Sequence, residues 1–150
     1  MKRWLVLCLA SLLCLCSCAQ EQRRAGVILG EYLAEQEGLP QGEIYYSGLS
    51  EGEAGHFSDR LAILMYGERA VRHTFPLIEE YAIFLCSFAE PCEIAVFRCY
   101  EKSDADRVAE MCLERVEQMR ILLGGTDFRT RADRATVTVD GCLVTMLLLP

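Results

Sequence analysis

The sequence predicts a single α+β domain with a four-stranded, largely antiparallel sheet in the order ββαββ, one long helix packed on it, and additional N-terminal helices. Three observations predict this fold: two strand-like segments separated by a proline-containing turn, a long amphipathic helix after them, and an Asp-Gly turn between two further strand-like segments. A chain of 150 residues can bury a core without metal or disulfide support. We therefore expect one domain over residues 25–150.

The first two strands are expected over residues 81–88 and 93–100, which are rich in aromatic and branched residues. Pro91 favours a turn between them. In the second segment both sets of alternating residues are largely apolar, so the periodicity does not say which face meets the helix. The two segments predict an antiparallel hairpin within a sheet that is covered on both faces.

The long helix is expected to begin at Ser103 as its cap, with Asp104 and Asp106 in the first turn, where carboxylates oppose the positive end of the helix. Apolar residues then recur at steps of three and four: Val108, Met111, Cys112, Val116, Met119, Leu122 and Leu123. The residues expected to face solvent are Glu110, Glu114, Glu117 and Arg120. Gly124 and Gly125 supply the left-handed conformation that ends the helix.

The last two strands are expected over residues 135–139 and 142–149. They flank Asp140-Gly141, a dipeptide that favours a two-residue type I′ turn. Residues 146–149 are too apolar for an exposed edge, so the final strand should lie inside the sheet or under a helix. Residues 126–134, with interleaved arginines and aspartates, are expected to form a polar connection.

The N-terminal half of the domain carries weaker signals. Helical spacing predicts a helix over residues 25–37, and a short strand can follow over residues 43–46. Residues 47–56 hold three glycines and two acids and are expected to form a loop. Ser58 is a suitable N-cap for a second helix of about three turns that ends before Gly67.

The start of the chain has the layout of a secretory signal. Residues 1–17 combine a short basic start with an apolar run, and this run is shorter than the roughly 20 residues that a membrane-spanning helix needs. The run ends in Leu15-Cys16-Ser17-Cys18, which resembles the lipobox of bacterial lipoproteins, so we expect lipidation of Cys18 and a tether over residues 18–24. Two alternatives stay open: an ordinary signal peptide cut nearby, or an uncleaved anchor.

Charge and composition exclude several classes of function. The formal net charge of -7 argues against nucleic acid or anionic lipid as a partner held by general electrostatics. His56 and His73 stand apart, with no ligand-like spacing to each other or to a cysteine. We expect no catalytic residue, no metal site and no cofactor.

Five cysteines follow the leader: Cys86, Cys92, Cys99, Cys112 and Cys142. Export would favour disulfides, and at most two can form within one chain. If the first hairpin turns around residues 90–92, Cys86 and Cys99 are near neighbours across it. Buried free thiols are the alternative, because Cys112 lies on the apolar stripe of the long helix.

Taken together, these segments resemble a family of small bacterial lipoproteins catalogued as domain of unknown function 4358. The likeness rests on the lipobox leader, Tyr81-Ala82-Ile83, Glu93-Ile94-Ala95-Val96-Phe97, the helix with Arg115, and Asp140-Gly141-Cys142-Leu143-Val144. It covers mainly residues 75–149. The family has no assigned function, so the resemblance implies a location in the cell envelope and identifies no functional residues.

These observations favour a non-enzymatic module of the cell envelope, tethered to the outer face of the membrane by its lipid. Its expected partner is an unidentified envelope protein or ligand, bound at the sheet edge or at the loop of residues 47–56. The alternative is an envelope hydrolase or thiol oxidoreductase. A thiol enzyme needs a reactive cysteine at a helix start or beside cations, and no cysteine begins a predicted helix.

Overall fold

The computed structural model describes residues 24–87 and 89–150. The helices are α2 (Ala25–Glu35), α3 (Asp59–Tyr66), α4 (Glu68–His73), α5 (Ala105–Leu122) and α6 (Arg129–Asp133), with 3₁₀ turns η2 (Phe75–Leu77) and η3 (Lys102–Asp104). The strands are β1 (Gly42–Tyr46), β2 (Ile78–Cys86), β3 (Glu93–Cys99), β4 (Thr136–Asp140) and β5 (Leu143–Leu148). They form one antiparallel sheet in the order β1-β2-β3-β5-β4. The α+β class is confirmed, but the sheet has five strands and not four.

The fifth strand of the sheet is β1, which was expected as a short strand over residues 43–46 and not as a member of the four-stranded sheet. It pairs with β2 from Gly42 opposite Cys86 to Tyr46 opposite Ala82. A segment of five residues carries too little periodicity to reveal a partner more than 35 positions away, because that pairing depends on the tertiary structure. β1 therefore extends the predicted hairpin to a three-stranded unit and forms one edge of the sheet.

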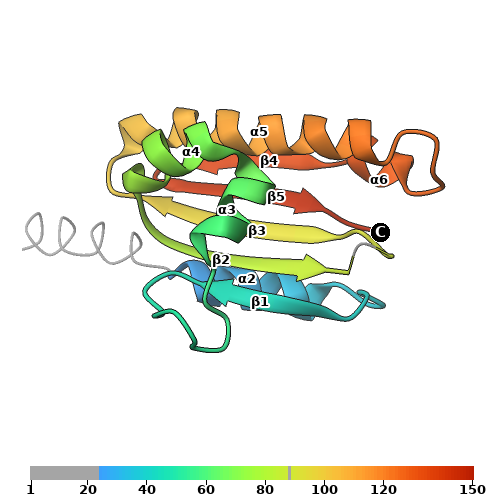
Figure 1. Cartoon of the computed structure of the whole chain (residues 1–150), viewed down its shortest axis with the longest axis horizontal. Helices are drawn as coiled ribbons and strands as arrows, with labels where there is room; N and C mark the ends of the chain where they lie inside the picture. Colours follow the sequence, from blue (N-terminus) through green and yellow to red (C-terminus); the bar gives the residue numbers. More distant parts are fainter. Residues whose placement is uncertain (1–23, 88) are drawn as a thin grey trace, which may run out of the picture.

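Helices cover both faces of the sheet, which confirms the expected double cover. Figure 1 shows α5, α3 and α4 on one face and α2 on the other. In β3, Ala95 and Phe97 are buried in the core on the α5 side, whereas Ile94 and Val96 pack in a second core with α2. All four side chains have no solvent exposure. β3 is thus the buried centre of a three-layer domain.

The apolar stripe of α5 is confirmed from Val108 to Met119, and Leu123 is buried just after the helix, but Leu122 is exposed. The predicted cap is wrong. Ser103 lies inside η3 and its hydroxyl donates to Glu101 Oε2 over 3.3 Å. The 3₁₀ turn already satisfies the backbone here, because the Asp104 amide donates to the Glu101 carbonyl, and the helix begins only at Ala105.

The first hairpin turns earlier than expected. Residues that face each other across β2 and β3 include Leu85 and Glu93, and the Cys86 amide donates to the Cys92 carbonyl over 3.0 Å. The turn therefore centres on Ala89, two residues before Pro91. The expectation that Cys86 neighbours Cys99 is wrong: Cys86 faces Cys92.

The closing hairpin lies where the sequence placed it, but its turn is shifted by one residue. Asp140 pairs with Leu143, so Gly141 and Cys142 form the two-residue loop. Gly141 has a φ of 62°, and no residue other than glycine has a positive φ in the described part of the chain. This pattern fits type II′, which needs glycine at its first position, and not type I′. β5 lies between β3 and β4, which confirms the expected inner position of the last strand.

The two N-terminal helices are confirmed: α2 ends two residues earlier than expected, at Glu35, and α3 lies between Ser58 and Gly67 as predicted. Ser58 caps α3, since its Oγ accepts a hydrogen bond from the Leu61 amide over 3.3 Å. α3 has only 8 residues, and α4 follows it directly after Gly67. The expected polar connection over residues 126–134 contains the short helix α6.

Val116→Asp should abolish folding. Val116 is 3% exposed in the core between α5 and the sheet, and its burial contributes about 1.5–3 kcal/mol. A carboxylate at this position would be buried without a partner, which costs several kcal/mol. Leu113→Asp on the same helix is the control, because Leu113 is 55% exposed. Thermal unfolding followed by circular dichroism should show a cooperative transition for the control only. A native-like transition for Val116→Asp would contradict the packing of α5.

Candidate functional site

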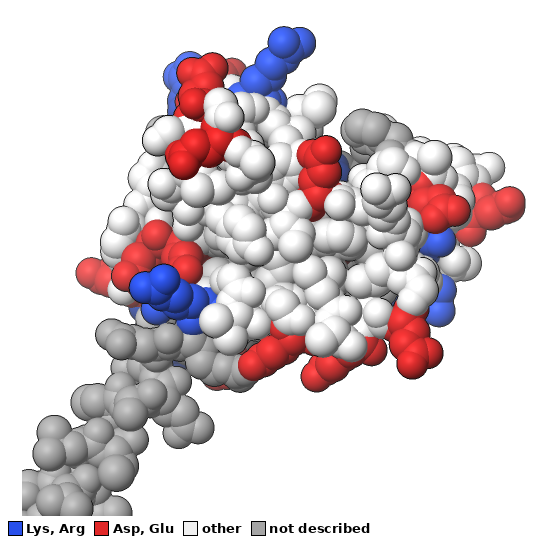
Figure 2. Space-filling model, turned by 90° about the horizontal axis from the view of Figure 1, so that it is seen from below, with Lys and Arg blue, Asp and Glu red and all other residues white. Residues whose placement is uncertain are grey.

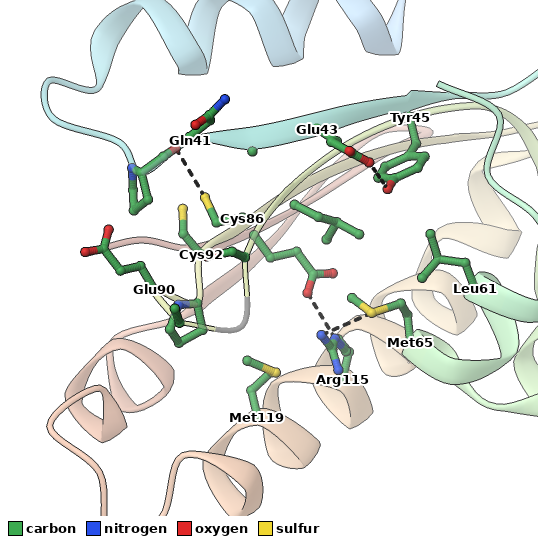
Figure 3. A pocket seen from close by; sticks show the side chains of 17 residues that line it. Gln41, Glu43, Tyr45, Leu61, Met65, Cys86, Glu90, Cys92, Arg115 and Met119 are labelled. Carbon is green, nitrogen blue, oxygen red and sulfur yellow. Dashed lines mark hydrogen bonds and ion pairs between the residues drawn. The ribbon is translucent and has the colours of Figure 1, made fainter. Parts of the chain in front are cut away.

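A pocket of about 640 Å³ lies at the end of the sheet where β1 and β3 begin and β2 ends. Helices α3 and α5 approach it from the other side (Figure 3). It is lined by Pro40, Gln41, Gly42, Glu43 and Tyr45 around β1, by Leu85, Cys86, Ser87 and 89–93 in the β2–β3 hairpin, and by Leu61, Met65, Arg115 and Met119 from the helices. Its volume falls in the range of small-molecule sites, about 300–1,000 Å³.

The walls of the pocket are mostly apolar. Leu61 and Met65 approach from α3 and Met119 from α5, and Figure 3 shows these side chains directed toward the strands. Leu85 and Pro91 line the sheet side. Methionine side chains are flexible and polarizable, so they adapt to irregular apolar partners. These walls suit a ligand with an apolar body.

The rim of the pocket is acidic. Exposed Glu43 and Glu90 both line it. The Tyr45 hydroxyl donates to Glu43 Oε2 over 2.6 Å. Burial, followed by the hydrogen bond to Glu43 and its charge, raises the pKa of Tyr45 to about 12. Tyr45 therefore stays protonated at neutral pH and holds the Glu43 carboxylate at the edge of the pocket.

A buried polar network lies on the inner side of the pocket. Arg115 Nε donates to Glu93 Oε2 over 3.0 Å, and the Tyr66 hydroxyl donates to Glu93 Oε1 over 2.8 Å. Glu93 is 2% exposed and Arg115 6% exposed. Burial, and then the charge of Glu93, raises the pKa of Tyr66 well above its usual value, so its hydroxyl keeps the proton that it donates. Both carboxylate oxygens of Glu93 thus have a donor.

The network has hydrogen-bonding capacity left for a ligand. Arg115 Nη2 donates to the Met65 sulfur over 3.5 Å, but a thioether is a weak acceptor. A ligand oxygen could replace it as a stronger acceptor, since a guanidinium carries five N–H donors in a fixed fork. The pair of Glu93 and Arg115 is neutral as a whole, so the inner wall of the pocket presents a strong dipole without net charge.

Two cysteines on the pocket wall face each other. The Cys86 thiol donates to the Pro40 carbonyl over 3.6 Å, and Cys92 is buried beside it. Burial raises the pKa of Cys86, and burial together with the facing Cys86 thiol raises the pKa of Cys92 to about 12. Thiolates are therefore scarce at neutral pH, which opposes the low thiol pKa that an oxidoreductase needs.

His56, His73 and Ser58, which a hydrolase could use, do not line this pocket. His56 lies in the loop after β1, where its Nδ1 is 2.9 Å from the Leu49 carbonyl oxygen. His73 lines a separate hollow of about 50 Å³ together with Arg107 and Glu114. Ser58 acts as the cap of α3. Cys18, the expected lipidation site, lies outside the described residues.

Sequence reasoning missed the polar network of Tyr66, Glu93 and Arg115. One signal was present: Arg115 occupies the apolar stripe of the helix, one turn before Met119, where only a partnered charge is tolerated. Glu93 likewise belongs to the same face of β3 as Ala95 and therefore points toward α5. A charged residue on each of two buried faces predicts an ion pair, but only the register of the sheet shows that the two meet.

Comparisons with protein-family models, with curated proteins and with solved structures find no match to this chain. Within residues 24–87 and 89–150, no helix is both long and apolar enough to cross a membrane. The same residues hold no group of three or more histidine, cysteine or acidic side chains suited to a metal ion. The pocket and its polar network are thus the basis for a functional proposal.

Arg115→Met should lower the free energy of unfolding by about 3–5 kcal/mol, because it leaves the Glu93 carboxylate buried with Tyr66 as its remaining donor. Combining it with Glu93→Gln should recover most of this loss, since glutamine removes the charge and still accepts from Tyr66. Urea unfolding measures both variants. In the control, Arg120→Met breaks two exposed pairs, with Glu117 and Asp133, and should change the free energy by less than about 1 kcal/mol. A double variant no more stable than Arg115→Met would contradict the network.

Proposed function

We propose that this chain is a lipid-anchored binding protein of the bacterial cell envelope, which takes a small molecule into the pocket at the end of its sheet. The ligand has an apolar body and an uncharged polar group, such as an amide. The observation that carries this proposal is the combination of apolar walls with a buried, neutral ion pair on the inner side of one pocket.

The apolar walls provide the binding energy. Removing apolar ligand surface from water contributes roughly 25 cal/mol per Å², and Leu61, Met65 and Met119 offer the matching surface. The polar group provides orientation, because a carbonyl oxygen can accept from Arg115 and an N–H can donate toward Glu93. A neutral amide carries both groups.

The charge of the pocket disfavours an ionic ligand. Arg115 is already paired with Glu93, so its charge is not free for a ligand carboxylate. The acidic rim of Glu43 and Glu90 would repel it as well. A ligand cation would lose its hydration among apolar walls, which costs several kcal/mol. An uncharged polar group avoids both costs.

The proposed location in the cell envelope rests on the sequence. Residues 1–17 have the layout of a signal peptide and Ser17-Cys18 ends its apolar run. Lipidation of Cys18 would attach two acyl chains, and each buried CH₂ contributes about 0.8 kcal/mol, so two chains anchor a protein stably. The resemblance to the lipoprotein family of unknown function rests in part on the same leader and assigns no ligand.

The surface charge agrees with a partner other than nucleic acid. Figure 2, which shows the side of the domain where α2 and β1 lie, has acidic side chains along much of its rim around an uncharged centre. The whole chain has 22 acidic residues against 15 lysines and arginines. Such a surface repels phosphate backbones and opposes non-specific nucleic-acid binding.

Leu61→Trp should weaken binding of a neutral apolar probe, because Leu61 lines the pocket and an indole would occupy part of its volume. The probe is N-phenyl-1-naphthylamine, whose fluorescence rises in an apolar site, titrated into the full chain in detergent below the concentration at which micelles form. Leu64→Trp on the same helix is the control, since Leu64 is exposed.

The expected result is saturable binding to the wild type and to Leu64→Trp, with affinity reduced at least about tenfold in Leu61→Trp, equivalent to about 1.4 kcal/mol. Circular dichroism confirms that both variants are folded. Equal binding by the two variants, or no saturable binding by the folded wild type, would refute the pocket as a binding site.

Cys18→Ala should prevent lipid attachment, because the thiol of Cys18 is the proposed acceptor of the diacylglyceryl group. Metabolic labelling with a fatty acid, followed by detergent partitioning, measures the effect. The wild type should carry label and enter the detergent phase. The variant should carry none, and should remain as an uncut precursor or be released. Equal label in both proteins, or none in the wild type, would refute the lipid anchor and leave a secreted or leader-anchored domain.

A further inference from the structure

We propose that the domain carries two cross-strand disulfides, Cys86–Cys92 and Cys99–Cys142, and that Cys112 stays a buried thiol. The two pairs lie at opposite ends of β3, the central strand. The inference concerns covalent modification and is independent of the ligand. Its basis is the register of the sheet, which pairs four of the five cysteines two by two.

The first pair joins β2 to the residue before β3. Leu85 is opposite Glu93, so the next position places Cys86 opposite Cys92, and the Cys86 amide donates to the Cys92 carbonyl over 3.0 Å. Directly opposed residues point to the same face, and hydrogen-bonded pairs have Cα atoms about 5.5 Å apart. Disulfides form at Cα separations of roughly 4.4–6.8 Å.

The second pair joins β3 to the turn before β5. Arg98 is opposite Leu143, which places Cys99 opposite Cys142, and the Cys99 amide donates to the Cys142 carbonyl over 2.8 Å. The same separation of Cα atoms follows. The hydrogen-bonded ladder therefore fixes the distance between Cys99 and Cys142, which makes these two cysteines partners.

Cys112 is the cysteine that remains. It has no solvent exposure and belongs to α5, in the layer above the sheet, so no ladder fixes its distance to Cys99. Burial, followed by the charges of Glu93 and Cys99, raises its thiol pKa far above the usual value. The thiolate is the attacking species in disulfide exchange. Cys112 is therefore the slowest of these cysteines to form a disulfide.

The chemistry requires an oxidant, which we take to be a disulfide of a small thiol or of an oxidoreductase. One protein thiolate attacks the oxidant disulfide, forms a mixed disulfide and releases one thiolate of the oxidant. The second protein thiolate attacks the mixed disulfide at the protein sulfur and releases the other. The protein loses two electrons and two protons for each bond, and the oxidant gains them as two thiols. An exported domain meets such oxidants.

These disulfides would be structural. Burial raises the thiol pKa of Cys92 to about 12 and that of Cys99 to about 11. A thiol with a high pKa is a poor leaving group, so a disulfide that contains it is broken slowly by exchange. The Cys86–Cys92 bond would also fix the hairpin wall of the pocket.

Trypsin separates the possible pairings. It cleaves after arginine and lysine, so Cys86 and Cys92 stay together in residues 73–98, whereas Cys99, Cys112 and Cys142 fall in residues 99–102, 108–115 and 135–150. The full chain, refolded in a mixture of oxidised and reduced glutathione, is alkylated without reductant, digested and measured by mass spectrometry.

The expected result is a 73–98 peptide lighter by two hydrogens, a 99–102 peptide joined to 135–150, and an alkylated 108–115 peptide. Cys112→Ser should leave both bonds in place, and Cys92→Ser should remove only the first. A link between 73–98 and 99–102, a link between 99–102 and 108–115, or full alkylation of the five cysteines would overturn the assignment. The four cysteines before residue 24 fall together in a separate peptide, residues 4–23, and the lipid and probe tests do not depend on this result.

Discussion

The contact on which the rest of the structure depends is the hydrogen-bonded group of Tyr66, Glu93 and Arg115. It joins the end of α3, the first residue of β3 and the middle of α5. A buried ion pair is often no more stabilising than apolar side chains of similar volume, but it loses several kcal/mol when one member is absent. The group therefore acts mainly as a constraint, because it fixes where the helical layer sits on the sheet.

The same constraint explains why the pocket lies at one end of the domain. Along the middle of β3, apolar side chains such as Phe97 fill the space between the sheet and α5, and rings of Tyr66, Phe75 and Tyr81 pack around it. At the start of β3, Glu93 stands in place of a large apolar side chain and holds Arg115. The aromatic packing stops there, and the space beyond it becomes the pocket.

The sequence predicted the parts of the fold that depend on local chemistry. The α5 stripe, the Ser58 cap and the Asp-Gly hairpin each follow from residues within a few positions of one another. It did not predict the place of β1, the facing of Cys86 and Cys92, or the meeting of Glu93 with Arg115, because each depends on register between distant segments. In the first hairpin the expected register was wrong because the turn centres on Ala89 and not on the residues around Pro91.

The geometry also relates the pocket to the proposed anchor. The Ala25 amide, at the start of α2, donates to Glu80 Oε2 over 3.2 Å, and Arg98 pairs with the same carboxylate. The first described turn of the chain is thereby fixed near the start of β2. Cys86 on the pocket wall is six residues further along this strand, about 20 Å away at 3.3 Å per residue. If Cys18 carries the proposed lipid, the anchored segment joins the domain at α2, whose start lies at the end of β2 opposite the pocket.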